Sequence, residues 1–100
     1  MEYAITVQSG KTIMFAKGDL KTSEASSFHK ELLGALKEHQ TVILDMAGVS
    51  YICSAGLRAL LAGQQYIDSV GVGDLILRNL TPEVESVIKA TGFNNVLTIV

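Results

Sequence analysis

The sequence lacks most of the features that mark secreted, membrane-spanning or nucleic-acid-binding proteins. It contains one cysteine in 100 residues, which excludes an internal disulfide framework, and no group of cysteines and histidines has metal-ligand spacing. The net charge of −2 provides no basic surface of the kind that nucleic acid attracts. No apolar run approaches the roughly 18 residues that a membrane span needs, and the N-terminus lacks the basic and apolar segments of a signal peptide. We therefore expect a cytoplasmic protein without a membrane span or a bound metal.

The composition does provide enough apolar residues for a core. Hydrophobic residues make up 48% of the chain and charged residues 18%, a balance typical of a folded rather than a disordered protein. The length is that of a single domain, and the sequence shows no repeat, linker or low-complexity segment. We expect one domain over residues 1–100.

The stretch from Thr41 to Ile67 predicts a strand, a loop and a helix. Val42–Leu44 is a continuous apolar run that stops at Asp45, which is typical of a strand covered on both faces. Apolar residues at helical spacing follow Ser54. Serine suits the start of a helix because its side-chain oxygen can accept from the free backbone N–H groups there. We therefore place Ser54 at or beside the N-cap.

The flanking segments predict the remaining elements. Before the central stretch, Tyr3–Val7 and Thr12–Ala16 predict a hairpin, and a helix capped by Thr22 or Ser23 ends near residues 38–40. After it, Leu75–Leu77 predicts a strand, and a helix follows with Thr81 as its cap, Pro82 at its first position and Gly92 at its end. Val96–Val100 is a terminal strand or tail. This order requires crossover helices. We predict an α/β fold: a mixed β-sheet in which a β-hairpin is followed by alternating α and β elements. The terminal strand would leave a sheet edge that could pair with another strand.

Three polar residues of the central stretch each have two interpretations. Ser54 is either a helix cap or a place for a phosphate, because the N–H groups and dipole of a helix start attract anions. Asp45 ends a strand at the edge where α/β sheets gather ligands, or it simply bonds the adjoining turn. Cys53 is a partly buried structural residue or a redox-sensitive thiol at a helix start, since neither His29 nor His39 is placed to act as its base.

The residues around Ser54 also admit a functional and a structural interpretation. Lys21 and Arg58 either form a basic rim around this serine or are ordinary solvated cations. Gly56 meets a backbone requirement for close approach at the helix start, and would leave room for a partner. Ala55 begins a row of alanines that could dock a partner, although alanine is also a good helix former.

The order of these motifs resembles the STAS domain family, and above all the small bacterial anti-sigma factor antagonists. The family segment is an apolar strand ending in Asp, a glycine-containing turn, an aromatic or aliphatic pair, and then Asp-Ser-Ser/Ala-Gly-Leu. Here it reads Val42-Ile43-Leu44-Asp45, Gly48-Val49, Tyr51-Ile52 and Cys53-Ser54-Ala55-Gly56-Leu57. The order of predicted elements matches over nearly the whole chain.

The resemblance implies a regulator of transcription that acts by protein–protein interaction, without enzymatic activity or a cofactor. Such an anti-anti-sigma factor captures an anti-sigma factor, often a serine kinase of the histidine-kinase-like ATPase fold, and so frees a sigma factor. The kinase phosphorylates the motif serine, which maps onto Ser54, and a serine phosphatase resets the cycle. The residues expected to contact the partner are Lys21, Thr22, Asp45, Cys53, Ala55, Gly56 and Arg58.

Two departures from the family pattern keep a second hypothesis open. The family commonly has Asp where this chain has Cys53, and Asp where it has Lys21, so both changes remove negative charge near Ser54. The alternative is a STAS subunit that is not phosphorylated and serves as a partner in a transport complex or a sensory scaffold. An enzyme would need an assembled set of acid and base groups, which the sequence does not contain.

Overall fold

The computed structural model describes all residues from 1 to 100 and contains one sheet with three helices. The elements in chain order are β1 (Glu2–Gln8), β2 (Lys11–Lys17), α1 (Thr22–His39), β3 (Val42–Gly48), α2 (Ser54–Val70), β4 (Leu75–Arg78), α3 (Pro82–Thr91), the 3-10 turn η1 (Phe93–Asn95) and β5 (Thr98–Ile99). This is the succession predicted from the sequence, with η1 added. The predicted α/β fold is therefore confirmed.

The sheet is mixed because a hairpin precedes the crossover units. Its strands lie in the order β1-β2-β3-β4-β5; β1 and β2 are antiparallel, and every later pair is parallel. The hairpin turns at Ser9 and Gly10, which both have positive φ, 52° and 77°, as tight two-residue hairpins require. Each parallel pair needs a crossover between its strands, and α1, α2 and α3 provide one each.

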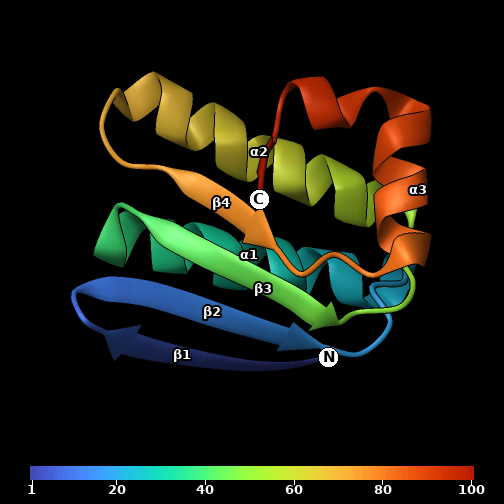
Figure 1. The fold of residues 1–100 in the computed structure, drawn as a ribbon, viewed down its shortest axis with the longest axis horizontal. Coiled ribbons are helices and arrows are strands. Elements are labelled where there is room, and N and C mark those ends of the chain that lie inside the picture. The colour runs from blue at the N-terminus through green and yellow to red at the C-terminus, as the bar shows by residue number, and fades with distance from the viewer.

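Helices α1 and α2 lie side by side on one face of the sheet (Figure 1). Under them, alternate strand residues are buried: Met14 in β2, Leu44 in β3 and Leu77 in β4 have no exposed surface. Phe28 and Leu60 come from the two helices to meet them and are equally buried. The core thus lies between the sheet and this helix pair, and Val84 and Ile88 of α3 complete it.

The opposite face of the sheet carries no helix (Figure 1), which corrects the prediction that residues 42–44 are covered on both faces. Val42 and Leu44 point into the core, while Ile43 lies on the other face and is half-buried. The register places Ile43 between Ile13 and Ile76 of the adjacent strands. These cross-strand neighbours shield one another, so an apolar run forms here without a covering helix.

The helix ends follow the predicted capping at α3 but not at α1. In α3 the Thr81 hydroxyl accepts from Val84 N–H at 3.4 Å, Pro82 is the first residue, and Gly92 ends the helix with φ of 78°. In α1 the N-cap is Lys21, without a side-chain hydrogen bond, so neither Thr22 nor Ser23 is the cap. None of the three helices is both long and apolar enough to cross a membrane.

Candidate functional site

The starts of α1 and α2 are held next to each other at the edge where β2 and β3 end (Figure 1). A single parallel bridge joins Leu20, just before α1, to Ile52, just before α2. Leu20 N–H donates to the Tyr51 carbonyl, and Cys53 N–H donates to the Leu20 carbonyl, both at 2.9 Å. This bridge also explains the cap of α1, because the chain enters the helix directly after Leu20. Residues far apart in sequence, 21–22 and 53–54, thereby become neighbours.

The loop between β3 and α2 is fixed from both sides. On one side Gly18 N–H donates to the Gly48 carbonyl at 3.0 Å, and the Ser50 hydroxyl donates to Asp19 Oδ1 at 3.2 Å. On the other side the Thr81 hydroxyl at the start of α3 donates to the Val49 carbonyl at 2.8 Å. Hydrogen bonds from both sides therefore hold the loop that leads into the start of α2.

Ser54 is the first residue of α2 and its side chain is exposed. The N-cap is Cys53, whose sulfur accepts from Gly56 N–H at 3.4 Å. Sequence reasoning placed Ser54 at or beside this cap, and it lies beside it. The N–H groups of Ser54 and Ala55 donate to no backbone acceptor, as expected for the first turn of a helix. An exposed hydroxyl thus lies beside two N–H groups that have no backbone acceptor.

Two exposed cations lie near the starts of the two helices. The first turn of α2 contains no acidic residue, and Arg58 is exposed one turn further along the same helix. Lys21, at the start of α1, is also exposed. The exposed carboxylate of Asp19, which accepts from the Ser50 hydroxyl, lies in the same region. Both cations are accessible, and the basic rim around Ser54 stays a prediction.

The other residues predicted to contact a partner differ in exposure. Thr22 is exposed, and Cys53 and Ala55 are partly exposed, so all three lie on the surface next to Ser54. Gly56 is buried: a Cβ on it would lie 2.7 Å from Leu20 Cγ. The predicted close approach at Gly56 is real, but it serves packing inside the domain. Its burial does not support direct contact with a partner.

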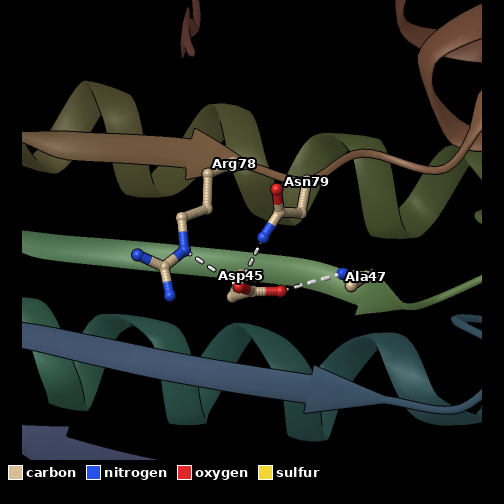
Figure 2. A network of polar contacts seen from close by, with 4 residues as sticks. All are labelled: Asp45, Ala47, Arg78 and Asn79. Atoms are coloured by element: carbon tan, nitrogen blue, oxygen red, sulfur yellow. Dashed lines mark hydrogen bonds and ion pairs between the residues drawn. The ribbon is translucent and has the colours of Figure 1, made fainter.

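Asp45 is also buried and fully engaged (Figure 2), but it does not end its strand, because β3 continues to Gly48. Its carboxylate accepts from Ala47 N–H at 3.0 Å, from Arg78 Nε at 2.8 Å and from Asn79 Nδ2 at 2.9 Å. Burial alone would raise the pKa of Asp45, but these hydrogen bonds and the charge of Arg78 outweigh it and hold the pKa below its usual value. The expectation of a turn directly after Asp45 is therefore wrong: this residue bonds the backbone within β3 and joins the strand to β4.

Sequence reasoning missed the residues that support and border the site. Asn79 has a φ of 56°, and its side chain reaches Asp45. Ser26 and His29 of α1 line a groove together with residues of α2. Helical spacing places Ala25 and His29 on one face of α1, and Ala55 and Ala59 on one face of α2, but it does not indicate that these two faces meet.

The hairpin-led mixed sheet and the exposed serine at the start of its second helix together define a STAS-type domain. The STAS domain family matches residues 2–100, and the chain belongs to this family. It is 31% identical over 91 residues to BtrV of Bordetella bronchiseptica, which is named as a candidate anti-sigma factor antagonist; the match covers 90% of this chain and 78% of BtrV. Sequence similarity thus agrees with the geometry.

Solved structures share the fold at lower identity. A candidate anti-sigma factor antagonist of Thermotoga maritima has a TM-score of 0.86 and 21% identity, covering 97% of this chain and 84% of its own. Unphosphorylated SpoIIAA has a TM-score of 0.77 and 18% identity, and the match covers 99% of this chain and 88% of SpoIIAA. Bacillus SpoIIAA in its phosphorylated form has a TM-score of 0.70 and 17% identity, and the match covers 99% of this chain and 91% of that structure. Anti-sigma factor antagonists therefore have this fold.

Proposed function

We propose that this protein is a cytoplasmic antagonist that binds an anti-sigma factor and is switched by phosphorylation of Ser54. The observation that carries the proposal is the exposed Ser54 hydroxyl at the start of α2, beside two N–H groups that have no backbone acceptor. The binding surface is formed by Lys21, Thr22, Cys53, Ala55 and Arg58, and the buried Gly56 lies beneath it. Asp45 faces the side of the sheet away from the helices and is not part of this surface. Binding, rather than catalysis by this chain, frees the sigma factor.

The modification step has a simple chemical requirement. The anti-sigma factor is a serine kinase of the histidine-kinase-like ATPase fold, and Ser54 Oγ attacks the γ-phosphorus of ATP. The new O–P bond forms as the bond to ADP breaks, and the hydroxyl proton is released. A structural neighbour that exists in both an unphosphorylated and a phosphorylated form supports this step, because it shows that the fold tolerates a phosphate. A serine phosphatase then hydrolyses the phosphoserine.

A phosphate at Ser54 is expected to change the surface rather than unfold the domain. It adds a charge of about −1.5 to −2, which the helix dipole and the free N–H groups favour. The same charge stands in the middle of the binding surface. It replaces a small neutral hydroxyl by a bulky anion and so weakens contact with the partner.

The test is incubation with each candidate kinase and ATP, and then intact-mass measurement. A gain of one phosphate that disappears in Ser54→Ala is the expected result. Ser23→Ala is the matched control, because Ser23 is equally exposed in the first turn of α1, and it should still be phosphorylated. The absence of a mass gain with all candidate kinases would favour the second function, a STAS subunit that works without phosphorylation, for which Cys53 in place of an acid is the motivating feature.

A further inference from the structure

A shallow groove separates the first turns of α1 and α2 beside Ser54. It has a volume of about 300 Å³ and is lined by Ala25, Ser26 and His29 of α1 and by Ala55, Arg58 and Ala59 of α2. This volume is at the small end for a ligand pocket. The groove therefore suits one or two side chains of a partner rather than a cofactor.

The shape of the groove comes from small residues at the helix contact. Ala25 and Ala59 are 6% and 5% exposed and form its floor. Ser26 and Arg58 are exposed and His29 is half-buried, so these three polar side chains stand around it. The alanines let the helices pack closely while leaving the space above them open to solvent.

The charge of the groove has one sign. No acidic side chain lines it, and each of its three polar side chains can donate a hydrogen bond. Arg58 belongs to none of the ion pairs of the domain, so no carboxylate lies within 4.0 Å of its guanidinium. Arginine presents a planar fork of donors that matches a carboxylate in a bidentate manner.

We infer that this groove receives an acidic side chain of the anti-sigma factor, and that Arg58 binds its carboxylate. The inference rests on the proposed function and specifies the chemistry of the partner. The alanine floor takes the methylene groups of an aspartate or glutamate, and the donors around it take the oxygens. Arg58 is then a specificity-determining residue of the interface.

The position of Arg58 also couples the groove to the switch. Ser54 and Arg58 are four residues apart on α2, so they lie on the same face one turn apart. A phosphate on Ser54 lies within reach of the guanidinium and competes with the carboxylate of the partner. Phosphorylation therefore withdraws the cation that holds the partner, in addition to adding repulsion.

The experiment measures the affinity of the purified anti-sigma factor for wild type, Arg58→Gln and Lys30→Gln by titration calorimetry. Lys30→Gln is the matched control, because Lys30 is an exposed cation of α1 outside the groove. Arg58→Gln should weaken binding about tenfold or more, with a smaller salt dependence than wild type. Lys30→Gln should stay within about twofold. Thermal melting should show that both variants are folded.

A second arm identifies the ligand of Arg58. Single acidic residues of the anti-sigma factor are changed to alanine and measured against wild type and against Arg58→Gln. One of them should weaken binding to wild type and have no further effect on Arg58→Gln. Two results would overturn the groove inference while the proposed function stands. In the first, Arg58→Gln has the same affinity as Lys30→Gln. In the second, every acidic substitution in the anti-sigma factor weakens binding to Arg58→Gln as much as it weakens binding to wild type. If wild type does not bind the anti-sigma factor at all, both are overturned.

Discussion

The side chain of Leu20 lies directly against the backbone of Gly56, where a side chain on residue 56 has no room. A Cβ there would lie 2.7 Å from Leu20 Cγ and 3.0 Å from Ile52 Cγ1. Leu20 is completely buried and is the residue that bridges to Ile52. This one contact sets how closely the start of α2 approaches the start of α1, and hence the geometry of the surface around Ser54.

Gly56→Ala should therefore destabilise the domain, by about 1–3 kcal/mol, because the added methyl forces Leu20 or the start of α2 to move. Gly34→Ala is the control: Gly34 is an exposed helical residue whose Cβ would meet nothing within 4 Å. That change should stabilise by about 0.5–1 kcal/mol, because alanine favours the helix. Urea denaturation measures both values. Equal effects of the two substitutions would contradict this account of Gly56.

A second prediction concerns Cys53, which caps α2 with a thiol. Sulfur is a weak acceptor, and its contact with Gly56 N–H is 3.4 Å. Cys53→Ser should cap α2 more strongly, and Cys53→Asp should add the favourable interaction of a negative charge with the helix dipole. Each substitution should raise the free energy of unfolding by about 0.3–1 kcal/mol. Cys53→Ala is the reference without a cap. Thermal melting should rank Asp and Ser above Ala; a variant series in which alanine is the most stable would show that the thiol does not cap.

The start of α2 shows where sequence patterns were informative and where they were not. The apolar run before Asp45, the helical spacing after Ser54 and the Thr81-Pro82 start of α3 follow local rules, and the structure has all three elements. These signals depend on backbone geometry and capping within a few residues. They predict which residues are in a helix or strand without knowledge of the rest of the chain.

The features that the sequence could not predict depend on contacts between distant segments. Lys21 became the cap of α1 only because Leu20 is bridged to Ile52. Asp45 is buried because Arg78, 33 residues later, reaches it. The open sheet face arises because both long helices pack on the other side (Figure 1). In each case the deciding interaction joins residues that are far apart in the sequence. Their spacing follows no helix or strand repeat, so no local pattern indicates the contact.

The network around Asp45 gives a third prediction, on pH. The folded state lowers the pKa of Asp45, so the folded protein binds this proton less readily than the unfolded chain. The stabilisation is complete above the unfolded-state pKa of about 4 and is lost as the pH falls towards the lower folded value. Asp45→Asn should lower the free energy of unfolding by about 1–3 kcal/mol at pH 7. The difference in unfolding free energy between this variant and wild type should shrink below about pH 4.

Denaturant melts of wild type and Asp45→Asn between about pH 7 and pH 2.5 make this measurement, since that range spans the loss of the carboxylate charge. Asp74→Asn is the control, because Asp74 is exposed and its carboxylate makes neither a hydrogen bond nor an ion pair. That variant should follow wild type across the range. A constant difference between wild type and Asp45→Asn at every pH would show that the carboxylate charge does not stabilise the fold.

Thr81 provides a fourth prediction, because one hydroxyl makes two contacts. It accepts from Val84 N–H and donates to the Val49 carbonyl, so it both caps α3 and fixes the loop before Ser54. Thr81→Val keeps the shape of the side chain but removes both hydrogen bonds. It should lower the free energy of unfolding by about 1–2 kcal/mol. Thr81→Ser keeps the hydroxyl and should cost less. Hydrogen exchange should show faster opening of residues 46–53 in Thr81→Val only; unchanged exchange there would mean that the loop does not depend on Thr81.

The last prediction separates charge at Ser54 from loss of its hydroxyl. Because Ser54 is exposed on α2, Ser54→Asp should fold normally and gain slightly in stability, since a carboxylate suits a helix start. The same charge should weaken binding to the anti-sigma factor, while Ser54→Ala binds as the unphosphorylated protein does. Calorimetric titration compares the three proteins. Ser23→Asp is the control, because it places the same charge in the first turn of α1. Equal affinity of Ser54→Asp and wild type would mean that negative charge at this helix start does not regulate the interface.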